Sequence, residues 1–232
     1  MMGIIGNMKK EIVIAAYDKD LNWLNDLNFD IKKTIYRKGN KTNDINEIYI
    51  ENNKGRCVHT FFNHILLKYD NLSDITYFAQ DYPFDHWENI IEILNDVESL
   101  QKEQLKIGGY YGYHWNTIKI HSDKGGIMWE LFPSTHHGDG NILYCDSNGQ
   151  PQDSNPLINV DKYWNLFFKS DPPNRYEFIP GGHFAITKEH VQIRSKEFYK
   201  NIVEFLLDEE VAPWIIERLE CYIFNPKYST IL

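Results

Sequence analysis

Residues 11–20, EIVIAAYDKD, decide the fold. Apolar and β-branched residues run without a break to Tyr17, and charged residues follow at once. A short continuous apolar run with a polar end is typical of a strand buried on both faces, as in a parallel sheet. Asp20 is a good N-cap, so we expect a short helix over residues 21–27. The segment therefore predicts the first strand and helix of an α/β fold.

The next hundred residues repeat this alternation. We expect strands over residues 33–37, 47–50 and 74–80, and helices over 55–69 and 87–104. The first of these helices carries apolar residues on one face at helical spacing, namely Val58, Phe61, Phe62, Ile65 and Leu66. Such alternation predicts a mostly parallel central sheet flanked by helices. We expect one domain over residues 1–232, with a flexible N-terminus over residues 1–10.

The middle of the chain is less regular. Residues 108–149 are rich in Gly, His and aromatic residues without a clear period, and we expect long loops over 134–155. We interpret 108–155 as an irregular insertion. Beyond it the pattern predicts helices over 161–169, 196–207 and 214–224, and a strand-like segment over 176–186 that Gly181 and Gly182 interrupt.

Composition narrows the functional classes. The net charge of −9 with scattered basic residues argues against nucleic acid as the main partner. The pairs Lys32–Lys33 and Arg37–Lys38 match a diphosphate in size and not a duplex. The three cysteines are far apart and form no CxxC pair, which favours a reducing compartment. We find no signal-peptide pattern and no apolar run of about 20 residues. We therefore expect a cytoplasmic protein without a membrane span; peripheral membrane association stays open.

Ligands of open α/β sheets bind beyond the carboxyl ends of the strands, and the first candidate segment lies there. In residues 15–20, the small side chain of Ala16 lets a ligand approach the backbone, and Tyr17 can stack on a base. A plain strand end with a helix cap at Asp20 is an equally good interpretation.

A second candidate segment, residues 80–86, follows the strand predicted at 74–80. It begins with Gln80 and brings Asp81, Asp85 and His86 together. Carboxylate oxygen and imidazole nitrogen bind divalent metals and also transfer protons. The alternative is a polar loop in which Asp85 caps the next helix.

Three weaker signals complete the set. Gly181 and Gly182 in an extended segment favour close approach of a ligand, or a simple bulge. Arg56 and His59 stand at the start of a predicted helix, where anions are favoured. Glu217 and Glu220 share one face of the last predicted helix, for which a solvated acidic face is the default interpretation.

Six blocks in order carry a family resemblance: 11–24 (EIVIAAYDKDLNWL), 34–39 (TIYRKG), 53–69 (NKGRCVHTFFNHILLKY), 70–86 (DNLSDITYFAQDYPFDH), 180–199 (PGGHFAITKEHVQIRSKEFY) and 217–224 (ERLECYIF). The chain resembles an uncharacterised glycosyltransferase-like family, domain of unknown function 3431. The resemblance spans nearly the whole chain. It implies a GT-A-like, Rossmann-like domain that transfers a sugar from a nucleotide-sugar donor to a glycan or other acceptor hydroxyl, as in polysaccharide biosynthesis.

The resemblance also implies roles for individual residues. Ala16, Tyr17 and Asp20 contact the nucleotide, and Glu217 is the candidate base, with Asp85 second. The remaining substrate-binding residues neutralise phosphate or line the sugar pocket: Lys38, Arg56, His59, Gln80, His86, Gly181, Gly182 and His183. No Asp-x-Asp metal motif is present, so a metal-independent reaction is open beside Mn or Mg held by Asp81 and Asp85.

The chain departs from the family pattern at several positions. The family usually has Asn-Glu where Asp18 and Lys19 stand, Glu at Cys57, Gly at Asp81 and Trp at Glu220. Two other classes therefore stay open. One is a catalytically inactive carbohydrate-binding protein. The other is a metal-dependent hydrolase that uses Asp81, Asp85 and His86.

Overall fold

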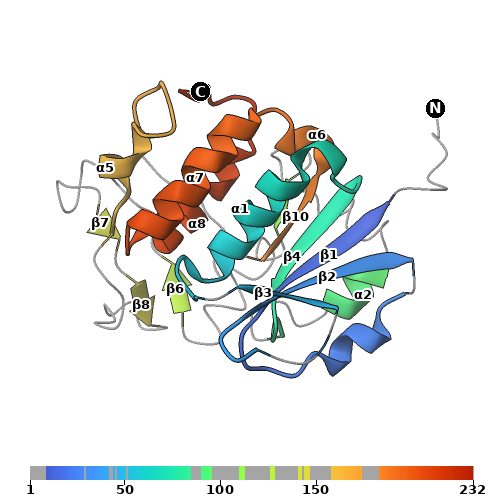
Figure 1. The fold of residues 1–232 in the computed structure, drawn as a ribbon. Helices are drawn as coiled ribbons and strands as arrows, with labels where there is room; N and C mark the ends of the chain where they lie inside the picture. Colours follow the sequence, from blue (N-terminus) through green and yellow to red (C-terminus); the bar gives the residue numbers. More distant parts are fainter. Residues whose placement is uncertain are drawn as a thin grey trace.

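A six-stranded sheet forms the centre of the molecule in a computed structural model (Figure 1). Its order is β3-β2-β1-β4-β10-β5. Strands β1 (Lys10–Ala16), β2 (Ile31–Lys38), β3 (Glu47–Ile50) and β4 (Ile75–Gln80) run parallel, whereas β10 (Phe184–Thr187) is antiparallel to β4 and to β5 (Tyr110–Gly112). The α/β class with a mostly parallel sheet is thus confirmed. The described residues are 9–28, 30–41, 44, 46–50, 52–84, 90–95, 110–112, 126–128, 141–142, 144–146, 158–173 and 183–231.

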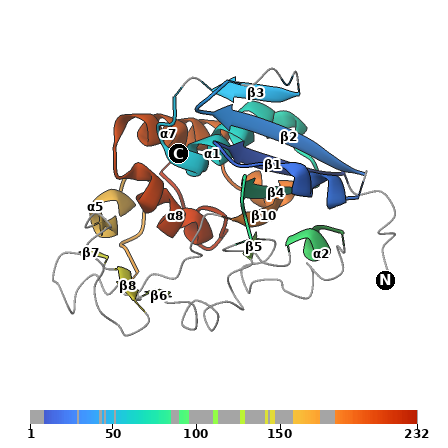
Figure 2. The ribbon, with the colours of Figure 1, turned by 90° about the horizontal axis from the view of Figure 1, so that it is seen from below.

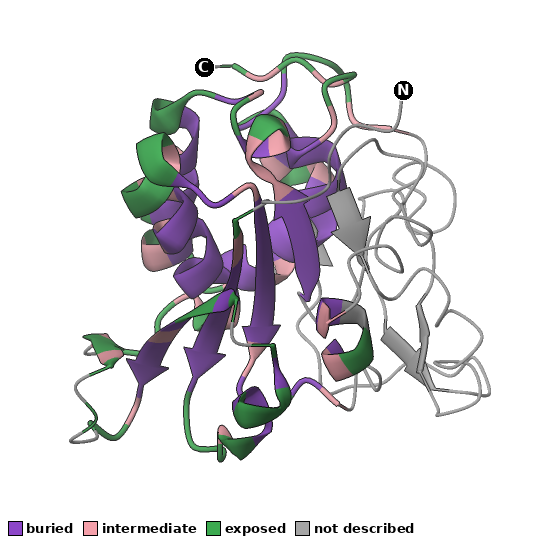
Figure 3. Ribbon diagram, turned by 90° about the vertical axis from the view of Figure 1, so that its right-hand side faces the viewer, coloured by how far each residue is buried: buried purple, intermediate pink, exposed green. Residues whose placement is uncertain are grey.

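Strand β1 is buried on both faces, as its apolar run predicts. Ile12 and Ile14 pack on one side of the sheet and Val13 and Ala15 on the other. Alternate side chains of a strand point to opposite faces, so β1 supplies two cores at once. Figure 3 shows the central strands buried along their length, with exposed residues on the outer surfaces of helices.

Helices cover both faces of the sheet (Figure 2). The helices α1 (Arg56–Lys68), α7 (Lys196–Asp208) and α8 (Ala212–Ile223) pack on one face, and the short helices η1 (Asn22–Asp26) and α2 (Ile90–Asn95) on the other. The smaller helices are η2 (Tyr69–Asn71), α5 (Val160–Trp164) and α6 (Lys188–Val191). This arrangement of helices on both sides of the sheet follows because the apolar stripe of each helix must be buried against the sheet.

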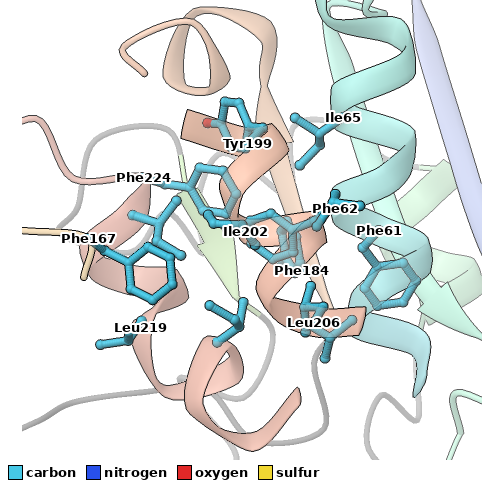
Figure 4. Packing of buried hydrophobic residues seen from close by; sticks show 14 of the residues in the cluster. Phe61, Phe62, Ile65, Phe167, Phe184, Tyr199, Ile202, Leu206, Leu219 and Phe224 are labelled. Atoms are coloured by element: carbon cyan, nitrogen blue, oxygen red, sulfur yellow. The ribbon is translucent and has the colours of Figure 1, made fainter. Parts of the chain in front are cut away.

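Aromatic rings fill the core beneath α1, α7 and α8 (Figure 4). Phe62 stacks on Phe224 with ring centroids 6.0 Å apart, and Phe78 lies 4.8 Å from Phe184. These pairs join α1 to the C-terminal end of α8 and β4 to β10. Many aromatic residues of this sequence lie in this core, where aromatic pairs add stability beyond their buried area.

A buried arginine fixes the end of α8. Arg194 donates from Nε to the carbonyl of Ile223 at 2.7 Å, and from Nη2 to the carbonyls of Tyr222 and Asn225. The last carbonyls of a helix have no partner within the helix. The guanidinium satisfies them in the interior and so holds α8 in place against the sheet.

Several sequence expectations are corrected. The segment after β1 is a 3-10 helix, with Leu21 and not Asp20 at its N-cap. The interval 134–155 was expected to be loop throughout. It contains β7 (Asn141–Ile142) and β8 (Tyr144–Asp146), which pair with β9 (Ile158–Asn159) and β6 (Gly126–Met128). Strands of two or three residues are too short to show a period.

Other expectations fall partly or wholly outside the described residues. These are the flexible N-terminus, of which Lys10 already belongs to β1, most of the helix over 87–104, and residues 174–182. The helix over 161–169 is shorter than expected, because α5 ends at Trp164. The single-domain assignment stays a prediction.

A polar network is buried at the amino end of β1. The Glu11 carboxylate accepts hydrogen bonds from Lys32, Thr34 and Ser73. The His64 imidazole lies 3.8 Å from Glu11, and its Nδ1 is 3.0 Å from the Tyr36 hydroxyl. Burial lowers the pKa of His64 to about 4. Burial by itself would raise the pKa of Glu11. The hydrogen bonds from Lys32 and Thr34 outweigh this effect, so the pKa of Glu11 is lowered.

The network predicts acid sensitivity. Native His64 stays neutral down to about pH 4, while the unfolded chain takes up a proton below about pH 6.5, so stability falls as the pH drops between these values. The contribution of Glu11 is lost at still lower pH. We expect His64 to account for on the order of 3 kcal/mol between pH 7 and pH 4. Urea unfolding across this range should show a flatter pH slope for His64→Gln than for the wild type. His190→Gln, at a more exposed imidazole, should change the slope less; equal slopes for all three proteins would contradict the assignment.

Candidate functional site

The carboxyl ends of β1, β2 and β4 meet at one edge of the sheet. Ala15 is in register with Gln80, and Ala16 with Arg37, one residue before the end of β2. Because β10 is antiparallel to β4, its beginning lies at this same edge. There the amide of Gln80 donates to Nε2 of His183 at 3.3 Å. Gln80 and His183, predicted separately from distant segments, are therefore neighbours.

Asp81 ties the loops after β1 and β4 together. Its Oδ2 accepts hydrogen bonds from the amides of Tyr17, Asp18 and Lys19 at 2.8, 3.1 and 2.9 Å. Its Oδ1 accepts from the amide of Tyr82, and its carbonyl accepts from the Trp23 indole at 2.9 Å. Strands β2 and β3 lie on one side of β1, and β4 lies on its other side. The carboxyl end of β1 is therefore the switch point of the sheet. A carboxylate of the protein itself occupies the concave backbone there.

These contacts bear on the predicted metal site. Asp81 is buried, and both its carboxylate oxygens accept backbone hydrogen bonds. To bind a metal ion, Asp81 would have to give up the charge-assisted hydrogen bonds that hold the loop after β1. Asp81 therefore does not fit the role of a metal ligand. Among the described residues no group of three His, Cys, Asp or Glu side chains is placed to hold an ion. Asp85 and His86 lie outside the described residues.

Lys38, the last residue of β2, is buried and holds the entry to α1. Its Nζ donates to the carbonyls of Lys54 and Arg56 at 2.9 and 2.6 Å. The chain turns sharply between them: Gly55 has φ +68° and Arg56 has φ +51°. A side chain at Gly55 would lie 2.5 Å from Cβ of His59 and 2.9 Å from the carbonyl of Leu206. Glycine is required here for both reasons.

Burial shifts the pKa values of three side chains where β2 ends and α1 begins, a region called here the α1 corner. The pKa of Lys38 is lowered to about 8 by burial. Burial and the nearby Lys38 charge lower the pKa of His59 to about 4. Burial, together with the charges of Glu217 and Glu220, raises the pKa of Cys57 to about 12. At neutral pH, His59 is therefore a neutral imidazole and Cys57 a thiol, which makes Cys57 a poor nucleophile.

Helix α8 brings charged groups to the same corner. Glu217, Arg218 and Glu220 are all buried. Arg218 bonds to the Glu217 carboxylate at 2.5 Å and to the carbonyl of Trp214 at 2.9 Å. The default interpretation of a solvated acidic face is wrong, because α8 is enclosed, Glu217 and Glu220 are both buried, and Glu217 is paired with Arg218.

Arg56 and Trp214 bridge α1 and α8. The Arg56 guanidinium lies over the indole ring, 4.5 Å from its centroid. Arg56 is exposed, and its guanidinium makes no hydrogen bond or ion pair with any residue that the structure describes. The cation–π contact holds the guanidinium in place and leaves its donors open.

The structure thus divides the predicted site residues into two groups. Lys38, Arg56, His59 and Glu217 converge around Cys57, at the start of α1. The loop after β1 forms the second group. Ala16 packs into the opposite core, Tyr17 is half-exposed against Gly39, and Asp20 binds the amide of Asn22. Gly181 and Gly182, like Asp85, lie outside the described residues.

Sequence reasoning missed three residues of this corner: Trp214, Arg218 and Cys57. Trp214 and Arg218 belong to a segment that was predicted as an ordinary amphipathic helix. The sequence signal for Arg218 is its place between Glu217 and Glu220 in an otherwise apolar helix. Cys57 carried one signal, its departure from the glutamate of the resembled family.

Comparisons with known proteins give a family and no individual relative. A family model described as "Protein of unknown function (DUF3431)" matches residues 12–230. No curated protein and no solved structure matches the chain significantly. In the part of the chain that the structure describes, no helix is both long and apolar enough to cross a bilayer.

The Asp81 contacts predict a stability effect. Asp81→Asn replaces charge-assisted bonds to amides with weaker ones and places an NH₂ group where an acceptor stood. We expect unfolding free energy to fall by about 2 kcal/mol or more. Urea denaturation measures this directly, with Asp26→Asn, an exposed aspartate at the end of η1, as the matched control. Equal stability of both variants would show that Asp81 does not hold the loop.

Proposed function

The chain belongs to the DUF3431 family of proteins of unknown function, and we propose that it is a GT-A-like glycosyltransferase. It transfers a sugar from a nucleotide-sugar donor to a hydroxyl of a glycan or other acceptor. The observation that carries the proposal is the convergence of a buried carboxylate, Glu217, with the basic residues Lys38 and Arg56 at the carboxyl edge of a parallel sheet.

The sheet supports this class of ligand. Four parallel strands in the order β3-β2-β1-β4 are the arrangement in which open α/β proteins bind nucleotides at the switch point. The loop after β1, with Tyr17 half-exposed and supported by Gly39, lies at that point. The nucleotide would lie along this loop, with its phosphates toward the start of α1.

The charges suit a displacement at an anomeric carbon. Glu217 takes the proton of the acceptor hydroxyl as its oxygen bonds to the anomeric carbon. The bond from that carbon to the donor phosphate breaks, and the nucleoside diphosphate leaves with the bonding electrons. Arg218 fixes the orientation of Glu217, and basic groups at the start of α1 stabilise the departing charge.

The two other classes fit less well. A metal-dependent hydrolase needs Asp81 as a ligand, and that carboxylate already accepts four backbone hydrogen bonds. A binding protein without turnover leaves unexplained why charged side chains are buried at the carboxyl edge, since burial of charge costs free energy.

Glu217→Gln tests the proposal. Glutamine keeps the size of the side chain and removes its basicity, so we expect the transfer rate to fall about 10²–10⁴-fold. Release of nucleoside diphosphate from a panel of nucleotide-sugars, with mixed glycan acceptors, gives the readout. Glu204→Gln, an exposed glutamate of α7, is the control and should keep full activity. A folded Glu217→Gln protein with the wild-type rate would rule out Glu217 as the base.

A further inference from the structure

Two polar side chains at the start of α1 have nitrogen atoms without a hydrogen-bond partner among the described residues. The Arg56 guanidinium rests on Trp214 with its donors uncommitted among the described residues. His59, in the first turn of the same helix, is 6% exposed, and its Nδ1 has no hydrogen-bond partner. A buried ring nitrogen without a hydrogen-bond partner destabilises a folded protein, so such a group calls for an explanation.

The surroundings favour an anion. His59 packs against Gly55, the residue that opens the helix, and the positive charge of Lys38 lies close to it. The thirteen-residue α1 adds the positive end of its dipole. Glu217 and Glu220 lie close enough to raise the pKa of Cys57, and the Glu217 carboxylate is paired with Arg218 at 2.5 Å. The positive charges of Lys38 and Arg56 would repel a cation here. A phosphate would be attracted by these charges and could accept hydrogen bonds from Arg56 and His59.

We propose that the first turn of α1 is a metal-independent anion site, in which the Arg56 guanidinium and the His59 imidazole bind a diphosphate. Neutral His59 donates from one ring nitrogen, and Arg56 supplies a fork of donors that matches phosphate geometry. Asp81 does not fit a metal ligand, and this site performs the charge neutralisation that a divalent ion would otherwise provide. That the diphosphate is the leaving group of the donor rests on the proposed function; affinity for a diphosphate does not.

Titration calorimetry with inorganic pyrophosphate in EDTA tests the site. We expect the wild type to bind, and Arg56→Gln to bind at least about tenfold more weakly, a loss of one charge-assisted contact. Lys54→Gln removes an exposed positive charge two residues away and should stay within about twofold of the wild type. His59→Leu, which keeps the buried volume, should also weaken binding and serves if Arg56→Gln does not fold.

The outcomes separate this inference from the proposed function. No heat of pyrophosphate binding to the folded wild type would overturn the inference, as would equal weakening by Arg56→Gln and Lys54→Gln. Equal binding by the wild type, Arg56→Gln and His59→Leu would overturn it too. The protein could bind pyrophosphate in an Arg56-dependent manner and yet turn over no nucleotide-sugar. That result would support the anion site and contradict the proposed transferase function.

Discussion

The Lys38 ammonium joins the end of β2 to the first turn of α1, and the candidate site depends on this contact. Its two hydrogen bonds, to the carbonyls of Lys54 and Arg56, span a turn with two consecutive positive φ values. The turn sets where Arg56 and His59 point and brings Cys57 toward the carboxylates of α8. Such backbone strain persists only where the surrounding structure over-determines it.

Polar side chains differ in their hydrogen bonding at the two ends of the sheet. At the amino end, Glu11 is fully satisfied by Lys32, Thr34 and Ser73, which makes that network structural. At the carboxyl end, Asp81 is satisfied in the same way, whereas Arg56 and His59 keep uncommitted donors within the described part of the chain. Satisfied buried charges specify a fold, whereas the unpaired groups of Arg56 and His59 are the ones that the proposed anion site would use.

The first half of the fold follows from its sequence. The apolar run of β1 and the spacing of Val58, Phe61 and Ile65 are local signals, and the observed strands and α1 match them within one or two residues. The direction of β10 was not predicted, because pairing of residues about 100 positions apart leaves no local period. The short strands between 108 and 155 were missed for the related reason that they have no period at all.

The candidate site was predictable only in part. Helix-opening residues Arg56 and His59 were found from their position, and Glu217 from the family resemblance. The burial of Glu217 and Glu220 was not, because charges at helical spacing usually face solvent. The structural role of Asp81 was also hidden, since its partners are amides 62–64 residues earlier in the chain.

The most direct test of a nucleotide-sugar site at the carboxyl edge is a thermal-shift screen of the folded protein against nucleotides and nucleotide-sugars, each with Mn²⁺, Mg²⁺ or EDTA. We expect one nucleotide class to raise the melting temperature in EDTA as well as in metal. A ligand at 100 times its Kd adds about 2.7 kcal/mol, or about 5–10 °C for a chain of this size. No shift with any nucleotide, from protein shown to be folded, would contradict the assignment of this edge as a donor site.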